Sequence, residues 1–220
     1  MARALRKSTG KTNALVVAHD PTDRARDKRE QIMQGALRTF LSNGYSASMD
    51  AIAAEAGVAK QTLYSYFGNK EDLFAALMDR LLEHFVDAGM TPELRALPTQ
   101  PFLRKLAQIT LSQMDDWEYV SMLRLVIGES ARFPQLSEVY LTRLVSPGIA
   151  KLTHYIKENE ELAFGDPEAV ARIMHGSLIN FIIAQEVLGG KHTMPISRER
   201  IINSLIDVIL FAAQQSAQSR

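Results

Sequence analysis

The side chains best suited to binding chemistry lie between Ser48 and Lys70, in the stretch SMDAIAAEAGVAKQTLYSYFGNK. Two short helical patterns meet there at Gly57, where glycine supplies the positive φ that a tight turn between helices requires. Apolar residues such as Leu63 fall on the inner side, and the outer side of the second helix carries hydrogen-bonding groups. This composition fits a helix that reads base edges in a DNA major groove about 12 Å wide. The outer residues are Lys60, Gln61, Thr62, Tyr64, Ser65 and Tyr66.

These polar side chains differ in what they can contact. Gln pairs bidentately with adenine and Lys donates to guanine, so Lys60 and Gln61 are predicted to read bases. Thr62, Tyr64 and Lys70 are predicted to hold phosphates, which positions a helix without specifying a sequence. The alternative is a structural helical hairpin with a polar outer face, which needs no DNA.

The sequence offers no constellation for catalysis or for metal binding. It has no cysteine, which excludes a thiolate nucleophile, a disulfide framework and a cysteine zinc site. It also lacks His-x-x-x-His and Glu-x-x-His pairs, a Gly-x-Ser-x-Gly elbow and a glycine-rich phosphate loop. We therefore expect a protein that is not an enzyme and needs no cofactor or metal.

Charge is distributed unevenly along the 220 residues, although the formal net charge is zero. Residues 1–70 carry 11 Lys/Arg and 6 Asp/Glu, a balance of +5, and the remainder carries 14 and 19, a balance of −5. The basic first third is therefore the expected surface for nucleic acid. No apolar run approaches the roughly 20 residues that span a bilayer, and residues 1–13 lack the apolar core of a signal peptide. We expect a cytoplasmic protein with no membrane partner.

Helices must position the outer residues, and the first four helices are predicted from caps and apolar spacing. Helical periodicity over residues 26–43 ends before Gly44, a residue suited to the left-handed conformation at a helix C-terminus. Ser48 is a predicted N-cap for the second helix, and Asn69 caps a long fourth helix. Residues 1–24 show no apolar periodicity and are predicted to form a disordered basic arm, which either adds DNA contacts or is a solvated tail.

The rest of the chain is predicted to be helical too, after a proline-containing connector at residues 91–101. Sustained period-two alternation is absent from the sequence, which argues against strands. Pro147, followed by Gly148, is expected to kink or interrupt one helix. The expected fold is all-α, with a three-helix N-terminal helix-turn-helix domain (25–70) joined through the fourth helix to a larger helical domain (71–220). The later helices are expected at residues 101–115, 117–131, 134–157, 167–187 and 197–217.

The run AIAAEAGVAKQTLYSYFGNKEDLF resembles the DNA-binding domain of the TetR (tetracycline-repressor) family of transcriptional regulators. The similarity extends from Arg26 to about Asp87 and is most specific over residues 63–73. It departs at Ala51, where the family often has Asp, and at Ala59, where the family usually opens the recognition helix with Ser or Thr. The DNA-binding positions that follow from the motif and the resemblance are Ser48, Ala59, Lys60, Gln61, Thr62, Tyr64, Ser65, Tyr66 and Lys70.

The last two expected helices are unusually apolar, and small residues such as Gly176 would let helices approach closely. One apolar stripe suffices for a core, so the surplus indicates a second buried face. The resemblance implies that this face forms a four-helix bundle with a second copy, which would present two recognition helices to a palindromic operator. An ordinary intrachain core explains part of the same stripe. The interface candidates are Val170, Ile173, Met174, Ser177, Leu178, Phe181, Ile202, Leu205 and Ile209.

The resemblance also implies an effector-binding pocket among the helices that follow Gly89. The segment RLVIGESARFPQL, residues 124–136, resembles effector domains of some family members. Each of the polar, aromatic and methionine residues there is alternatively a core or surface residue. The pocket candidates are Met114, Trp117, Met122, Arg124, Phe133, Tyr140, His154, Tyr155, His175 and Asn180.

Together these observations predict a DNA-binding transcriptional regulator, a repressor that binds a palindromic operator as a homodimer and is released by a small-molecule effector. Two alternatives remain at this point. The C-terminal domain could bind a partner protein in place of a small molecule, or the protein could be an enzyme that acts on nucleic acid.

Overall fold

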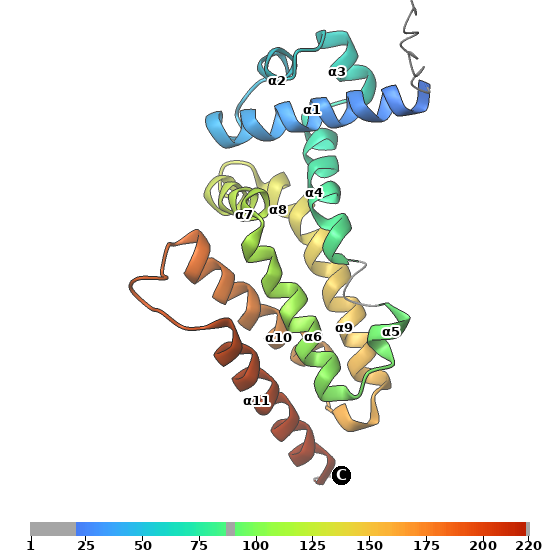
Figure 1. The fold of residues 1–220 in the computed structure, drawn as a ribbon, viewed down its shortest axis with the longest axis vertical. Coiled ribbons are helices and arrows are strands. Elements are labelled where there is room, and N and C mark those ends of the chain that lie inside the picture. The colour runs from blue at the N-terminus through green and yellow to red at the C-terminus, as the bar shows by residue number, and fades with distance from the viewer. Residues whose placement is uncertain (1–20, 87–90, 219–220) are drawn as a thin grey trace, which may run out of the picture.

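The computed structural model describes residues 21–86 and 91–218, and every regular element within these ranges is a helix (Figure 1). This confirms the all-α prediction. None of the described helices is long and apolar enough to cross a membrane. The helices are α1 (Pro21–Asn43), α2 (Met49–Glu55), α3 (Lys60–Tyr66), α4 (Lys70–Val86), α5 (Pro92–Arg95), α6 (Thr99–Ser112), α7 (Trp117–Glu129), α8 (Pro134–Tyr140), α9 (Ser146–Glu158), α10 (Pro167–Ile182) and α11 (Arg198–Gln218).

Helices α1–α3 form the N-terminal domain, and its turns follow from the residues expected at them. Gly44 ends α1 with φ +73°, and Gly57 joins α2 to α3 with φ +63°, both in the left-handed region where glycine is favoured. The Ser48 hydroxyl accepts a hydrogen bond from the Ala51 amide at 3.1 Å and so caps α2. These local signals therefore fix where α2 and α3 begin.

A contact between backbones sets how α1 and α2 cross. A Cβ atom added to Gly35 would lie 2.6 Å from the Ala56 Cβ and 2.7 Å from its Cα. The Gln31 side-chain amide donates to the Ala56 carbonyl at 2.7 Å beside this crossing. Only glycine fits at position 35, and the sequence pattern alone did not reveal it.

Helix α1 begins earlier than its apolar periodicity indicates. Residues 21–24, which were expected to belong to the disordered arm, are the first turn of α1. Pro21 suits this position because the first helical residue needs no amide hydrogen. The remainder of the expected arm, residues 1–20, lies outside the described residues.

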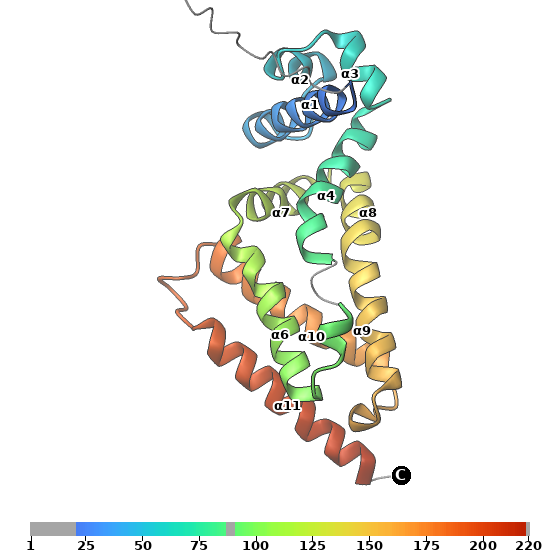
Figure 2. The same ribbon diagram turned by 45° about the vertical axis from the view of Figure 1, so that its right-hand side comes forward.

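The C-terminal helices match the expected order with two local differences. The expected connector at 91–101 contains the short helix α5, capped by the Thr91 hydroxyl, and α6 already begins at Thr99. The expected interruption near Pro147 is a π-helical turn, Leu141–Val145, between α8 and α9. Proline offers no amide hydrogen to the preceding turn, and the chain continues as a helix beyond it (Figure 2).

Helix α4 leads from the N-terminal domain to the helices below it, and α7 packs against α1 (Figure 2). Aromatic rings fill the junction: Tyr45 lies 5.4 Å from Phe40, 5.5 Å from Phe74 and 5.2 Å from Phe133, measured between ring centroids. Tyr45 is buried. The two domains therefore share a continuous apolar core, which transmits a shift in one to the other.

Candidate DNA-reading helix and effector cavity

The outer face of α3 is open to solvent. Lys60, Gln61 and Ser65 are exposed. Tyr64, a large aromatic side chain, is 43% exposed. On the inner side Leu63 is fully buried, so the helix cannot rotate without exposing it. The seven-residue helix thus presents a fixed set of donors and acceptors that suits contact with base edges.

Lys60 is held by a carboxylate of the neighbouring helix. Its ammonium lies 2.7 Å from Asp50 Oδ1 on α2, and this hydrogen-bonded partner raises the pKa of Lys60. Both side chains are more than half exposed, so the pair contributes little to stability. Its consequence is orientation: the charge of Lys60 is kept beside α2 and 6.0 Å from the Tyr64 ring centroid.

The remaining polar positions of α3 are less available. Thr62 is half-buried, and its carbonyl accepts a hydrogen bond from the Ser65 hydroxyl at 2.7 Å. Tyr66 is half-buried and packs against the apolar core. Ala59 occupies the N-cap of α3 with extended backbone and gives no side-chain hydrogen bond to the first amides. Ser48, which caps α2, is exposed.

The Lys70 ammonium already makes intrachain bonds, and its predicted phosphate contact stays a prediction. Its Nζ donates to the carbonyls of Tyr45 at 2.9 Å and Ala47 at 3.3 Å. It also lies 4.5 Å from the Tyr45 ring centroid and 5.9 Å from that of Phe133. Lys70 therefore ties the loop between α1 and α2 to the start of α4, because these carbonyls would otherwise lack a donor.

A cavity of about 120 Å³ lies between α6, α9 and α10. Most of its wall consists of leucine, isoleucine, alanine and methionine side chains. A small number of polar groups in an apolar wall is typical of sites for small molecules. The polar residues that line it are Thr110, Gln113, Tyr119, Lys151 and His175.

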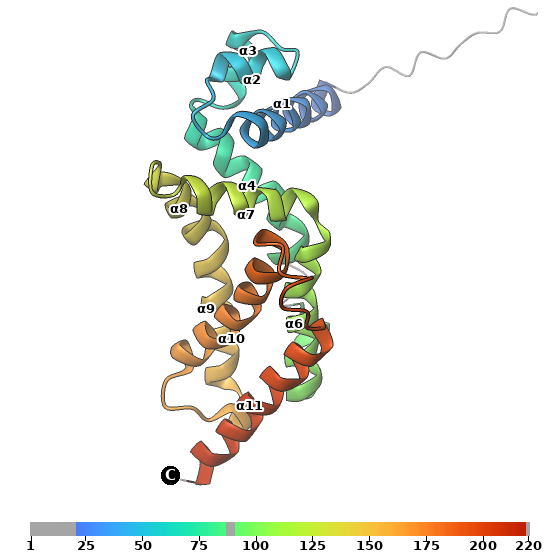
Figure 3. The same ribbon diagram turned by 90° about the vertical axis from the view of Figure 1, so that its left-hand side faces the viewer.

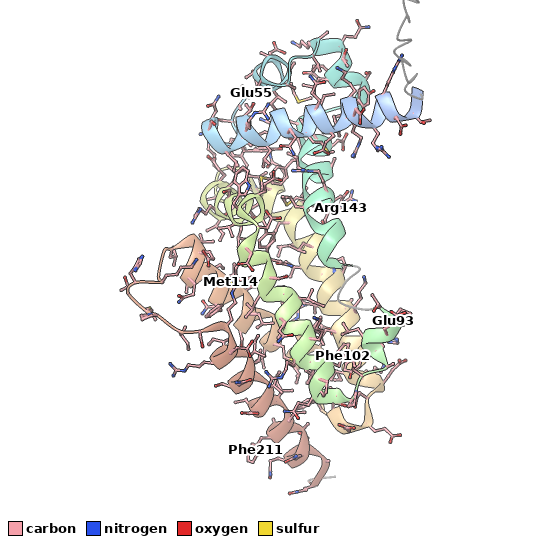
Figure 4. All side chains as sticks on the ribbon, viewed as in Figure 1. Glu55, Glu93, Phe102, Met114, Arg143 and Phe211 are labelled. Carbon is pink, nitrogen blue, oxygen red and sulfur yellow. The ribbon has the colours of Figure 1, made fainter. Side chains whose placement is uncertain are left out.

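Of the ten residues expected to line an effector pocket, His175 lines this cavity, and burial lowers its pKa. Met122 and Tyr140 line a separate, much smaller void beside α4. Met114 is buried but is not part of the cavity wall (Figure 4). Sequence reasoning assigned these side chains to one pocket because it could not tell which side of each helix faces which neighbour.

Two aromatic candidates belong to packing elsewhere. Phe133 lies at the junction with the N-terminal domain, against Tyr45. Tyr155 stacks on Phe102 with 3.8 Å between ring centroids, and its hydroxyl accepts a hydrogen bond from the Asn159 amide at 3.0 Å. The expectation that Phe133 and Tyr155 line the cavity is therefore wrong.

Four further candidates are exposed and do not line the cavity either. Trp117 is 63% exposed and borders a surface depression formed with α1 and α2. Arg124 donates to the carbonyls of Val187, at 3.2 Å, and Glu186. His154 pairs with Glu158 at 3.3 Å on the surface of α9. The fourth is Asn180, on the outer side of α10.

The residues expected at a dimer interface divide into two groups. Five are buried within the single chain, two are partly buried, and two are exposed on α10. Met174 and Leu178 even line the cavity, and the buried five offer little exposed surface, so their interface role stays a prediction. The buried residues are Met174, Leu178, Phe181, Ile202 and Ile209, the partly buried ones Val170 and Leu205, and the exposed ones Ile173 and Ser177.

Sequence reasoning missed two exposed apolar residues of α11. Val208 is 63% exposed and Phe211, labelled in Figure 4, is 64% exposed, whereas Ile206 and Ile209 of the same helix are buried. Helices α10 and α11 both lie on the side of the C-terminal domain turned toward the viewer in Figure 3. Spacings of three and four residues on α11 could have separated this outer stripe from the core stripe.

Residues 21–86 and 91–218 contain no group of three or more His, Asp or Glu side chains that could hold a metal ion. The cavity wall contains no acidic side chain among its described residues.

Two family models match the chain. Residues 32–77 match bacterial regulatory proteins of the tetR family, and residues 101–213 match the C-terminal domain of AefR-like transcriptional repressors. The uncharacterized HTH-type transcriptional regulator YhgD of Bacillus subtilis is 35% identical over 96 residues, 39% of this chain and 50% of that protein. The fatty acid metabolism regulator protein of B. subtilis is 40% identical over 63 residues, 28% of this chain and 32% of that protein. The chain thus spans half or less of the length of these curated relatives.

Solved structures extend the similarity over both domains. The flavonoid-responsive regulator FrrA is 30% identical, with a TM-score of 0.70 over 85% of this chain and 97% of that chain. The fatty acid degradation regulator FadR from Bacillus halodurans shares the fold at 23% identity, with a TM-score of 0.63 over 83% of this chain and 94% of that chain. With the helix-turn-helix at one end and the helical C-terminal domain at the other, this chain belongs to the TetR family of DNA-binding transcriptional regulators.

Proposed function

We propose that the protein is a homodimeric repressor that holds a palindromic operator through α3 of each protomer and releases it when a small molecule fills the cavity. The observation that carries this proposal is the exposed hydrogen-bonding face of α3, on a helix whose other side is locked into the core. FrrA, which is similar to this chain over both domains, is named as flavonoid-responsive. A small cavity with a mostly apolar wall suits a small molecule better than a partner protein.

On DNA, Gln61 and Lys60 are the proposed base-reading residues, and Tyr64 and Ser65 are proposed to contact the backbone. Lys60 must exchange Asp50 for a DNA acceptor, since its ammonium is paired in the free protein. The exchange makes Asp50 part of the recognition surface, because its carboxylate repels phosphates unless a cation or a cytosine amino group faces it.

The proposed dimer forms through the outer stripes of α10 and α11. Ile173 and Ser177 are exposed on α10, with Gly176 between them, and Val208 and Phe211 are exposed on α11. A Cβ atom at Gly176 would meet nothing within 4 Å in the single chain, so there is room for a second helix to approach. A two-fold axis through these stripes would place the two copies of α3 about 34–36 Å apart, one turn of DNA.

A row of charged contacts connects the cavity with the DNA-binding domain. Tyr119 lines the cavity, and its neighbour Glu118 on α7 lies 2.5 Å from Arg80 on α4. The same guanidinium lies 3.0 Å from Glu30 on α1. We propose that a ligand which displaces α7 shifts this row and with it α1, and that the preference of the ligand for the shifted state limits the loss of DNA affinity.

The DNA contact is tested on duplexes selected from a random pool by the full-length protein. Lys60→Ala should weaken binding and reduce the slope of log K against log salt by about 0.9, because the protein loses one cation that displaces counterions from the DNA as it contacts a base. Lys105→Ala, which removes an exposed lysine of α6, is the matched control and should leave the slope unchanged. Equal slopes for Lys60→Ala and the wild-type protein would remove α3 from the proposed DNA interface.

The dimer is tested by light scattering coupled to size exclusion. Phe211→Glu should shift the protein toward monomer and lower its affinity for the selected duplex, since a carboxylate would be buried between protomers. Ile127→Glu is the matched control, because Ile127 is 46% exposed on α7, away from α10 and α11. A Phe211→Glu protein that stays dimeric would contradict the proposed interface.

A further inference from the structure

The cavity of the C-terminal domain contains a buried amide with no partner. Gln113 lies in the 3₁₀ turn Gln113–Asp115 at the end of α6, is 7% exposed, and lines the cavity. Its Oε1 accepts no hydrogen bond from residues 21–86 or 91–218. Leaving a buried acceptor unpaired costs about 1–3 kcal/mol, so such atoms are rare in folded proteins. The orphaned oxygen therefore indicates a donor that the chain itself does not provide.

Two other polar side chains of the wall, Thr110 and His175, can also accept hydrogen bonds from a ligand. The Thr110 hydroxyl donates to the Leu106 carbonyl at 3.0 Å, which leaves its own lone pairs available. His175 makes no hydrogen bond to the part of the chain that the structure describes, and burial lowers its pKa. It is therefore neutral near pH 7, with one ring nitrogen that accepts and one that donates. Lys151 is the cationic residue of the wall and already has an interaction of its own.

The size of the cavity limits what can bind. Its volume is about 120 Å³. An engineered apolar cavity of about 150 Å³ accommodates benzene. This cavity is smaller but partly open to the surface, so it is suited to one ring whose substituents point toward the opening. The aliphatic side chains around it, such as Leu103, Ile149 and Met174, favour an apolar ring over a sugar or a nucleotide.

We propose that this cavity binds an uncharged single-ring molecule with a hydroxyl group, such as a substituted phenol, and that the hydroxyl donates to Gln113 Oε1. This inference rests on the proposed function in one respect: it takes this cavity as the site where the effector binds. A hydroxyl matches the wall because it donates to Gln113 and can accept from the donating nitrogen of His175. A ligand without it would leave the amide oxygen dry and unpaired.

The inference is tested with three probes that share an ethylphenyl group and differ at the para position: 4-ethylphenol, ethylbenzene and 4-ethylbenzoate, titrated calorimetrically into the full-length protein. 4-Ethylphenol should bind about tenfold more tightly than ethylbenzene, the effect of one hydrogen bond to an otherwise unpaired acceptor. Equal affinity for the two would overturn the inference. Tighter binding of 4-ethylbenzoate would also overturn it, because the wall would then be selecting an anion.

Substitution of the amide identifies its role. Gln113→Met should abolish the preference for 4-ethylphenol, and Gln108→Met, which removes an amide from α6 outside the cavity wall, should retain it. A Gln113→Met protein that keeps the preference overturns the inference. If that variant is unfolded, the wild-type side-chain amide resonances of Gln113 serve instead, and they should shift with 4-ethylphenol and not with ethylbenzene.

Release of the selected duplex, followed by fluorescence anisotropy, separates the two hypotheses. If 4-ethylphenol binds with a Gln113-dependent preference and the duplex stays bound, the ligand class is supported and ligand-driven release is contradicted. If another compound releases the duplex and 4-ethylphenol shows no preference over ethylbenzene, release is supported and the ligand class is overturned.

Discussion

The two domains differ in how tightly they are packed. In the N-terminal domain, α1 and α2 touch at the backbone, with no room for a methyl group at Gly35. In the C-terminal domain, α6, α9 and α10 leave a cavity of about 120 Å³ with an unpaired amide in its wall. Close packing in the N-terminal domain fixes the direction of α3. A cavity lacks van der Waals contacts, and a ligand that fills it can make them. The difference separates the proposed recognition helix from the proposed ligand site.

The largest expected effect is on stability, and it tests the close packing of the N-terminal domain. Gly35→Ala should lower the free energy of unfolding of the N-terminal domain by about 3 kcal/mol, because the new Cβ would lie within 2.8 Å of three Ala56 atoms. Binding to the selected duplex should weaken as α2 is pushed away from α1. Urea unfolding followed by circular dichroism measures the first effect, and fluorescence anisotropy the second.

The matched control for this substitution is Gly128→Ala in α7, where a Cβ atom would meet nothing within 4 Å. It should stabilise the protein by about 0.5–1 kcal/mol, since alanine is the better helix former. Equal destabilisation by both substitutions would mean that the contact of Gly35 with Ala56 does not decide the packing of the N-terminal domain.

The second prediction concerns the connection between the domains. Arg80→Met should lower the free energy of unfolding by about 2 kcal/mol, because Glu118, whose side chain is only 19% exposed, would lose its cation. It should also reduce the change in DNA affinity that a ligand produces. The control is Arg143→Met, which breaks an exposed ion pair between Arg143 and Asp79, the α4 residue next to Arg80. It should change the unfolding free energy and the ligand-induced change in DNA affinity little. A ligand response that survives Arg80→Met unchanged would exclude Arg80 from the coupling.

The N-terminal domain could be predicted largely from the sequence because its signals are local. The cap at Ser48 and the positive φ at Gly44 and Gly57 depend on neighbouring residues alone. The intrachain bonds of Lys70 could not be predicted, for the opposite reason. Its ammonium bonds to carbonyls 23 and 25 residues earlier in the chain, and no helical spacing reports such a contact.

The cavity could not be predicted because it depends on which sides of separate helices meet. His175 and Trp117 both suited a pocket by residue type, yet only His175 faces the cavity. Gln113 was not considered, since a glutamine near a helix end looks like a surface residue until its burial is known. The apolar stripe of α11 was recognised, but Ile209 of the core and Phe211 of the surface are only two residues apart.

The third prediction concerns the pH dependence of stability and tests the cavity of the C-terminal domain. Burial lowers the pKa of His175, so the unfolded chain, with an ordinary histidine pKa near 6.5, takes up a proton first as the pH falls. The contribution of neutral His175 is fully present above about pH 6.5. It decreases below that by at most about 1.4 kcal/mol per pH unit until the folded-state pKa is reached.

Urea unfolding at pH 7.5, 6.5 and 5.5 measures this contribution. His175→Gln should flatten the pH dependence of the unfolding free energy over that range. If His175→Gln retains the wild-type pH dependence, the cavity wall is wet enough to charge His175 freely.

The smallest expected effect concerns the start of α3, where the N-cap residue Ala59 makes no side-chain hydrogen bond. Ala59→Ser would supply the hydroxyl that the N-cap lacks, in a backbone already extended as caps require. The substitution should raise the free energy of unfolding by about 0.5–1 kcal/mol. Ala54→Ser on the exposed outer side of α2 is the control and should not raise it, because serine inside a helix has no free amide to cap.

If Ala59→Ser tightens DNA binding by more than this stabilisation explains, the new hydroxyl also contacts DNA. A gain in stability alone would mean that the missing hydroxyl weakens only the helix.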